Sequence, residues 1–482
     1  MVALGGLVAG LLAGERLGPA PAVAAVAAGA VGLVAAWCTA GPVRVACAAV
    51  ALGALGCASM QRALDGQEHH GWAAAVARGD DALVSGTLAS DPDGGRFRAE
   101  ASVRAGGPGR ILSVRAAPDD AARLQALEAG DRVTLSGRLR PLDPADRAEQ
   151  RARWRHAVAV LEDARVEAFA PPSAPLWRLA NALRGAVRRG AEPLPPAQRA
   201  LARGFVLGDT RGVPDDVADA YRDAGLSHLL AVSGQNVAFV LALVAPLLRR
   251  LPLGARTAAA GVTVVVFAAA TRFEPSVVRA SALAGVTILA TFAGRPAGRV
   301  RALVLALAAA LLADPFLVHS VGFRLSAAAS AGIVCLARPI AQHIAGPAPL
   351  RDALAVSAAA QLGVAPVLLA TFGEVPLVTP LTNLLAAPAA ALLGAAGLPV
   401  LAAAGVVPGL APVLTPVVGL ALAWVGLVAR AGAAAGPVVD ARGAAVVSAA
   451  VAVATLARRA RRAPAARDRT RARGAVPPTA PR

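Results

Sequence analysis

One apolar stretch of the chain contains four side chains whose chemistry stands out. Residues 225–248 read GLSHLLAVSGQNVAFVLALVAPLL, and His228, Ser233, Gln235 and Asn236 interrupt an otherwise lipid-compatible sequence. On a helix, His228 and Gln235 are seven residues apart and share one face. A polar group inside a bilayer must find a hydrogen-bond partner. The stretch therefore predicts either hydrogen bonds to neighbouring helices or a polar cavity, with the helix loosened at the Ser233 and Gly234 pair.

A histidine and a serine in one segment also suggest a membrane-embedded hydrolase acting on a lipid-linked substrate. A serine nucleophile needs a base, and that base needs a third group to orient it. No acidic residue lies at a suitable spacing from His228 and Ser233. A hydrolase is therefore the weaker alternative.

Similar polar side chains recur in later apolar segments. Arg279 follows Pro275 by one turn, Arg324 lies among serines and alanines, and Gln361 and Asn383 interrupt two further segments. An arginine at the centre of a bilayer costs about 2.5–3.5 kcal/mol on insertion scales. An arginine near the end of a span would instead extend to the interface. Two arginines and several amides among small residues predict a polar interior pathway that attracts an anion.

The composition identifies the class of protein that contains these residues. The chain has 482 residues, of which 56% are hydrophobic and 16% charged, and several apolar runs approach the ~20 residues that cross a bilayer. The formal net charge is +18, and much of it lies in the arginine-rich tail from residue 458. Such a tail is typical of a cytoplasmic end under the positive-inside rule, and contact with an acidic partner is the alternative.

The pattern changes along the chain and predicts a polytopic α-helical membrane protein with an external OB-like β-barrel domain. We expect about 11–12 spans, some of them broken or re-entrant helices. The expected divisions are N-terminal transmembrane helices at 1–60, an OB-like β domain at 61–173, amphipathic helices at 174–225, a transmembrane channel domain at 226–457 and a disordered tail at 458–482.

The polar second division alternates with period two. In GDRVTLSGRLRP, Val133, Leu135 and Leu139 lie on one side, while Arg132, Arg138 and Arg140 lie on the other. Around five such strands in about 100 residues suit a small barrel of the OB type. The arginine face is a candidate contact for a nucleic-acid backbone, as in other barrels of this type. A solvated sheet face is the favoured interpretation, because stacking aromatic residues are scarce there.

Arginines between the apolar segments predict the sidedness of the chain. Clusters at 249–250, at 295–301 and near 338 fall between alternate spans and on the same side as the tail. The positive-inside rule makes that side cytoplasmic and places the barrel outside. The expected localisation is the bacterial plasma (inner) membrane, with several passes.

Five ordered motifs resemble the ComEC-type competence protein family. They are LGDTRGVP (207–214), GLSHLLAVSGQNV (225–237), PSVVRA (275–280), DPFLVHSVGFRLSAAASAGI (314–333) and AQLGVAPVLLATFGEVPLVTPLTNLLAAP (360–388). The resemblance extends over nearly the whole chain, including the barrel. It implies an inner-membrane channel that imports single-stranded DNA during natural transformation. It also implies single-stranded DNA, membrane lipid, a separate motor, a DNA-receptor protein and a second copy of the chain as partners.

Residues that match the family motifs are expected to line the pathway or to fix its structure, and none is expected to be catalytic. They are Asp209, Arg211, His228, Ser233, Gln235, Asn236, Arg279, Phe323, Arg324, Ser326, Gln361 and Asn383. Many family members read SGLH where this chain has Ser233-Gly234-Gln235-Asn236, so polarity is kept and a titratable ring is not.

A second difference from many family members concerns the C-terminal metallo-β-lactamase-like domain, which we expect this form to lack. The six histidines contain no His-x-His-x-Asp-His cluster, and the four cysteines have no ligand-like spacing. No nucleotide-binding loop of the G-x-x-x-x-G-K-[ST] type is present. The sequence thus predicts no enzyme, no metal and no cofactor, and a small-anion transporter remains an alternative to the DNA channel.

Overall fold

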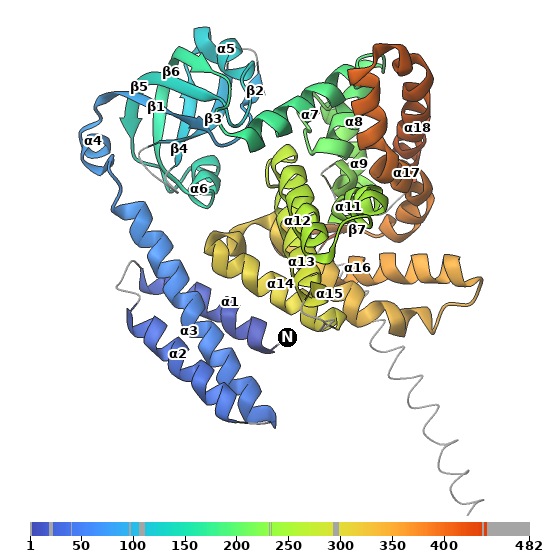
Figure 1. Cartoon of the computed structure of the whole chain (residues 1–482), viewed down its shortest axis with the longest axis horizontal. Helices are drawn as coiled ribbons and strands as arrows, with labels where there is room; N and C mark the ends of the chain where they lie inside the picture. The colour runs from blue at the N-terminus through green and yellow to red at the C-terminus, as the bar shows by residue number, and fades with distance from the viewer. Residues whose placement is uncertain are drawn as a thin grey trace, which may run out of the picture.

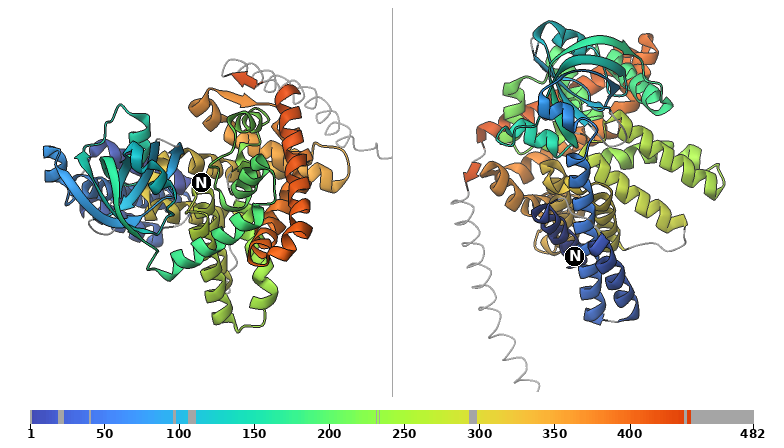
Figure 2. Two further views of the ribbon diagram at one scale, coloured as in Figure 1. Left: turned by 90° about the horizontal axis from the view of Figure 1, so that it is seen from above. Right: turned by 90° about the vertical axis from the view of Figure 1, so that its left-hand side faces the viewer.

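The computed structural model describes residues 2–18, 23–39, 41–95, 98–105, 111–230, 232, 234–292, 298–435 and 438–440. Three bodies follow one another along the chain: an N-terminal helical bundle, a β-barrel and a large helical body (Figure 1). The bundle and the barrel lie on the same side of the helical body, with the bundle beyond one end of the barrel (Figure 2).

The N-terminal bundle consists of α1 (Val2–Leu17), α2 (Val23–Cys38) and α3 (Gly41–Glu68). Glycines allow α1 and α3 to pack at backbone distance: a Cβ at Gly10 would lie 1.8 Å from the carbonyl oxygen of Gly53. Small residues at a helix interface are the usual means of association inside a bilayer. Leu7, Leu11 and Met60 are fully buried in a core shared with the helical body.

The barrel follows the short helix α4 (Ala73–Arg78). Its strands are β1 (Asp81–Leu88), β2 (Asp93–Gly95), β3 (Arg98–Arg104), β4 (Ile111–Ala116), β5 (Arg132–Arg140) and β6 (Ala157–Ala170). The pairs β1–β3, β3–β4, β5–β6 and β1–β5 are antiparallel, β4–β6 is parallel, and this circuit closes the barrel. Helix α5 (Ala121–Gln125) lies between β4 and β5. This connectivity confirms the predicted OB-like barrel.

The period-two pattern of β5 explains its place in the barrel. Val133, Leu135 and Leu139 are buried in the barrel core, as the alternation predicts, while Arg132 and Arg138 are exposed. Successive side chains of a strand point to opposite faces, so alternate hydrophobic residues fill the interior.

The helical body begins with α7 (Pro175–Ala191), α8 (Pro196–Leu207) and α9 (Asp215–Asp223). It continues with α10 (Ser227–Leu230), α11 (Gly234–Leu248), α12 (Leu253–Ala270), α13 (Pro275–Phe292), α14 (Arg299–Ala313), α15 (Val321–Ala341), α16 (Ala348–Phe372), α17 (Thr379–Val406) and α18 (Ala411–Ala435). Three 3-10 segments cover Pro118–Asp120, Pro315–His319 and Pro408–Leu410, and a further helix, α6 (Arg147–Arg153), belongs to the barrel. The short strands β7 (Glu374–Pro376) and β8 (Val438–Asp440) pair with each other.

Six helices among the described residues are long and apolar enough to cross a membrane, which makes this a polytopic membrane protein. They are Gly41–Glu68, Leu253–Ala270, Val321–Ala341, Ala348–Phe372, Thr379–Val406 and Pro408–Ala435. Shorter apolar helices cover Ala25–Ala36, Gly234–Leu248 and Pro275–Ile288. The predicted apolar segment centred near residue 449 and the predicted tail lie outside the described residues.

Close helix packing fixes α7 across the end of α17. A Cβ at Gly405 would lie 1.8 Å from the carbonyl oxygen of Ala186, and a Cβ at Gly190 would lie 1.9 Å from that of Leu401. No side chain fits between the two backbones at this crossing. The amphipathic α7, which leads away from the barrel, is therefore held against the membrane helices (Figure 1).

Candidate functional site

Two loops of the barrel dock on the helical body. The loop after β1 carries Asp91, and the loop between β5 and β6 carries Trp154 and His156. The Trp154 ring stacks on His319 with 4.0 Å between ring centroids, and Nε2 of His156 lies 3.2 Å from a carboxylate oxygen of Asp314. These are the two loops that flank the ligand face of OB barrels. In this chain they contact the protein's own helices.

A buried ionic network joins the first of these loops to the helical body. Arg184 of α7 is only 2% exposed, and its Nη2 donates to Asp91 of the barrel at 2.6 Å and to Asp209 at 3.3 Å. Its Nη1 donates to the carbonyl oxygen of Ala270 at 2.9 Å. A buried charge is tolerated only when it is paired and hydrogen-bonded in this way. We call Asp91, Arg184, Asp209, Arg211 and Arg272 the interdomain network.

Asp209 and Arg211 form a two-pronged ion pair inside this network. Nε of Arg211 lies 2.7 Å from Oδ1 of Asp209, and its Nη2 lies 2.9 Å from Oδ2. Burial would raise the pKa of Asp209, but the hydrogen bond and charge of Arg211 and the charge of Arg184 lower it to about 2. Arg211 also donates to the carbonyl oxygen of Pro92 at 3.0 Å. This motif pair therefore fixes the barrel against the helices.

Arg272 completes the network from the turn between α12 and α13. Arg272 and Phe273 both have positive φ angles, 57° and 54°, which non-glycine residues rarely adopt. Nη2 of Arg272 lies 2.8 Å from Asp91, and its Nη1 donates to Asn181 at 2.8 Å. Its guanidinium also lies over the ring of Trp177, 5.5 Å from the centroid. These contacts hold the unusual turn in place.

The sequence did not single out Asp91, Arg184 and Arg272 as candidate functional residues. One signal was available: Arg184 lies among Ala180, Ala186 and Val187, on the side of the amphipathic α7 that becomes buried. Nothing in the local pattern of Asp91 or Arg272 distinguishes them from surface charges, because their partners lie 93 and 181 residues away in the chain.

A second site lies where the opening stretch of the sequence is interrupted. Helix α10 ends at Leu230 and α11 begins at Gly234, and Val232 between them is not helical. The carbonyl oxygen of Val232 accepts a hydrogen bond from the hydroxyl of Ser276 at 2.6 Å. The helix is therefore broken where the Ser233 and Gly234 pair was expected to loosen it. Ser233 itself lies outside the described residues.

Arg279 of α13 lies beside this break. A Cβ at Gly234 would lie 2.7 Å from Nη2 of Arg279, so a side chain at this position would displace the end of the guanidinium. Nε of Arg279 donates to the hydroxyl of Ser326 on α15 at 2.5 Å. The structure thus brings together Arg279, Ser326 and the broken helix from three separate motifs. We call Val232, Gly234, Ser276, Arg279 and Ser326 the helix-break site.

The other polar residues of the opening stretch have different surroundings. His228 and Gln235 are exposed, and Nδ1 of His228 lies 3.2 Å from the carbonyl oxygen of Gly225. Asn236 is buried at 7% exposure, and its amide donates to the carbonyl oxygen of Phe205 at 3.1 Å. Asn236 therefore joins α11 to α8.

The remaining motif residues divide between α15, α16 and α17. Arg324 is exposed, while its neighbour Phe323 is buried at 3% exposure. Gln361 donates to the carbonyl oxygen of Pro376 at 3.1 Å, and Asn383 donates to the hydroxyl of Ser357 at 3.0 Å. Gln361 thus joins α16 to β7, and Asn383 joins α17 to α16. In the described part of the chain, these two bonds do not include a residue of the helix-break site.

The three barrel arginines proposed for DNA contact are not equivalent. Arg140 pairs with Glu149 at 2.6 Å and with Glu162 at 2.9 Å, and the hydrogen bond to Glu149 raises its pKa further above the ordinary value. Arg138 is exposed and donates to the carbonyl oxygen of Gly79 at 3.2 Å, and Arg132 is exposed. Arg132 and Arg138 are thus the more accessible of the three. Among the described residues, no group of three His, Cys, Asp or Glu side chains could hold a metal ion.

These features define a polytopic helical membrane protein with an OB-like barrel fixed to its helices and a broken helix beside an arginine. Residues 205–462 match the competence protein family, and the chain belongs to this family. It is also 30% identical over 190 residues to ComE operon protein 3 of Bacillus subtilis (strain 168). That alignment covers 39% of this chain and 24% of the relative, so the chain spans about a quarter of the relative's length. No solved structure matches the chain.

Proposed function

We propose that this protein conducts single-stranded DNA across the bacterial plasma membrane during competence. The helix-break site is the observation that carries this proposal, and membership of the competence protein family supports it. A broken helix exposes backbone groups that are tolerated at membrane depth only next to protein or water. Arg279 gives the break a positive charge, which a polyanion requires.

The charge at this site suits passage better than tight binding. The Ser326 hydroxyl accepts a hydrogen bond from Nε of Arg279, and this bond fixes the guanidinium plane. Arg324, His228 and Gln235 are also exposed, on α15, α10 and α11. Conduction requires contacts that are favourable enough to admit each phosphate and weak enough to release it. A few scattered arginines and amides meet that requirement.

The distribution of arginines supports a barrel on the outer side. The barrel contacts Arg272, at the end of α12, and Asp314, at the end of α14. The opposite ends of these helices carry exposed arginines: Arg249, Arg250 and Arg256 around the start of α12, and Arg299 and Arg301 at the start of α14. The positive-inside rule assigns the arginine-rich ends to the cytoplasm. DNA would then meet the barrel first and the helix-break site later.

Partners complete the proposed transport. The sequence contains no G-x-x-x-x-G-K-[ST] loop, so we assign the driving force to a separate motor and the delivery of DNA to a separate receptor protein. Assembly with a second copy of the chain belongs to the same proposal.

The experiment is uptake of labelled DNA by cells of the native host that lack the gene. Nuclease-resistant label in the cytoplasm should fall to background and return with the intact gene. Arg279→Gln should restore little uptake, whereas the control Arg256→Gln, at the exposed start of α12, should restore it fully. Unchanged uptake after deletion of the gene would overturn the proposal.

A reconstitution separates the DNA channel from a small-anion transporter. Purified full-length chain in proteoliposomes should admit a labelled oligothymidylate to the lumen, where added nuclease does not reach it. Flux of labelled inorganic phosphate without oligothymidylate entry would instead identify the small-anion transporter.

A further inference from the structure

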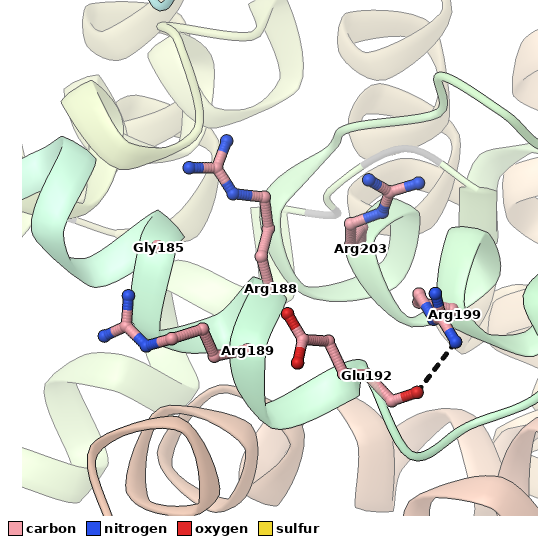
Figure 3. A pocket seen from close by; sticks show the side chains of 6 residues that line it. All are labelled: Gly185, Arg188, Arg189, Glu192, Arg199 and Arg203. Atoms are coloured by element: carbon pink, nitrogen blue, oxygen red, sulfur yellow. Dashed lines mark hydrogen bonds between the residues drawn. The ribbon is translucent and has the colours of Figure 1, made fainter. Parts of the chain in front are cut away.

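A cationic pocket lies between α7 and α8, and none of its lining residues belongs to the helix-break site. Gly185, Arg188, Arg189, Glu192, Arg199 and Arg203 line a cavity of about 310 Å³ (Figure 3). Four arginines and one glutamate therefore border one space. Like charges at this density repel one another, so the arrangement needs a physical explanation.

Backbone carbonyls hold three of these guanidinium groups in position. Arg189 donates to the carbonyl oxygen of Gly405 at 3.1 Å. Arg199 donates to the carbonyl oxygens of Glu192 and Leu194 at 2.7 and 3.2 Å, and Arg203 donates to that of Arg211 at 3.2 Å. A neutral carbonyl fixes the plane of a guanidinium without cancelling its charge. The pocket is therefore positively charged and oriented before any ligand binds.

The carboxylates nearby offset only part of this charge, although that of Glu192 also lines the pocket. Arg188 forms an ion pair with Glu128 of the barrel. Within the described ranges, no ion pair joins a carboxylate to Arg189, Arg199 or Arg203. The buried Nε atoms of Arg199 and Arg203 also lack a hydrogen-bond partner in the described part of the chain. An oxyanion in the pocket would supply negative charge to these guanidinium groups.

The location of the pocket indicates which anion it meets. Arg188 contacts the barrel directly, and Arg203 binds the backbone of Arg211, whose guanidinium binds Pro92 of the barrel. The pocket thus lies on the barrel side of the helical body. Guanidinium groups recognise phosphate through paired N–H donors, and such contacts do not depend on base sequence.

We infer that the arginine pocket of α7 and α8 binds a phosphodiester group of single-stranded DNA at the barrel side of the protein. This inference rests on the proposed function and adds a phosphate-binding site ahead of the helix-break site. The barrel contacts favour DNA over the phosphate of a lipid headgroup, because a strand that reaches the barrel also reaches the pocket.

The test is binding of a fluorescent oligothymidylate to the full-length chain in nanodiscs at several salt concentrations. The double variant Arg189→Gln/Arg199→Gln should weaken binding about tenfold and lower the salt slope by about 1.4, since each phosphate contact contributes about 0.7 for single strands. The control Arg178→Gln, exposed on α7 outside the pocket, should bind as the unmodified chain does. The double variant Arg189→Gln/Arg199→Lys should recover part of the affinity that Arg189→Gln/Arg199→Gln loses, because the positive charge at position 199 remains.

The outcomes separate the inference from the proposed function. An unmodified chain that binds no oligothymidylate would count against both. If the unmodified chain binds oligothymidylate, and the double variant binds with the same affinity and salt slope as the control, only the inference about the pocket is overturned. If the double variant co-purifies with less phosphatidylglycerol than the unmodified chain and keeps its oligothymidylate affinity, the pocket is a lipid site and the inference is also overturned. If the double variant does not fold, the single charge reversal Arg189→Glu, at an exposed position, provides the same comparison.

Discussion

The carboxylate of Asp91 on the barrel lies 2.6 Å from the guanidinium of Arg184 on α7, although 93 residues separate them in the chain. Because Arg184 also binds Asp209, one buried side chain joins the barrel, the amphipathic helix and the LGDTR motif. The barrel is therefore held at a fixed place beside the helical body. Under the proposed function, a DNA strand that followed the barrel would be directed to the same part of the membrane domain.

Removal of Asp91 should release the barrel. Asp91→Asn leaves Arg184 and Arg272 with less negative charge nearby, and breaking a buried ion pair costs about 3–5 kcal/mol. We expect faster proteolysis of the segment between β6 and α7 in the full-length protein. The control Asp80→Asn removes an exposed pair with Arg78 and should change stability by about 0–1 kcal/mol. Equal proteolysis rates for the two variants would contradict a structural role for the network.

The docking of the barrel should resist acid. The pKa of Asp209 is lowered from its ordinary value of 3.8 to about 2. A lowered pKa means that the stabilisation is complete above the ordinary value and is lost as the pH falls toward the lowered one. The distance between spin labels on the barrel and on α12 should therefore stay constant from pH 7 to about pH 5 and change only in stronger acid. A change centred near pH 6 would contradict control of the docking by Asp209.

Gly234 should be essential for the helix-break site. Gly234→Val places a Cβ 2.7 Å from Nη2 of Arg279 and 3.0 Å from Cβ of Ala280, so Arg279 must move. We expect DNA uptake to fall at least tenfold while the protein remains in the membrane. Gly261→Val on α12 is the matched control, because a Cβ at Gly261 has no atom within 4 Å. Full uptake by the Gly234 variant would show that the position of Arg279 does not matter for transport.

The crossing of α7 and α17 should tolerate no side chain. Gly405→Ala introduces a Cβ 1.8 Å from the carbonyl oxygen of Ala186, and overpacking of this kind costs about 1–3 kcal/mol. Thermal unfolding in detergent should occur at a lower temperature than for Gly409→Ala, whose Cβ would have no neighbour within 4 Å. The same unfolding temperature for both variants would show that α7 can move away from α17 without loss of thermal stability.

Much of the architecture was predictable because local patterns determine it. The period-two alternation in β5 predicted a half-buried strand, and Val133, Leu135 and Leu139 are buried in the barrel core. Long apolar runs predicted membrane helices, and six helices of sufficient length are present among the described residues. The helix break at Val232 followed from a small, polar pair in an apolar run. The alternation of apolar residues and the hydrogen bonding of the backbone within a helix or strand both involve residues that are close in the chain. The sequence therefore carries their signal.

The partners of the polar residues were not predictable. Asp209 and Arg211 were expected to line a pathway or to fix structure, and only the fold shows that they bind each other and the barrel. The roles of the other motif residues in DNA passage stay predictions. An ion pair depends on distance and solvent exclusion, and both depend on where separate elements come together.

By itself, the amino-acid sequence determined that this is a polytopic membrane protein with an OB-like barrel and polar residues in apolar segments. Hydrophobic periodicity and length alone impose those features. The tertiary structure decided which arginine faces which acceptor: Arg184 meets Asp91, Arg279 meets Ser326, and Arg199 meets backbone carbonyls beside a pocket lined mainly by arginines. An isolated arginine looks the same in each segment, and only the groups that the fold brings to it decide whether its charge is neutralised or remains free for an anion.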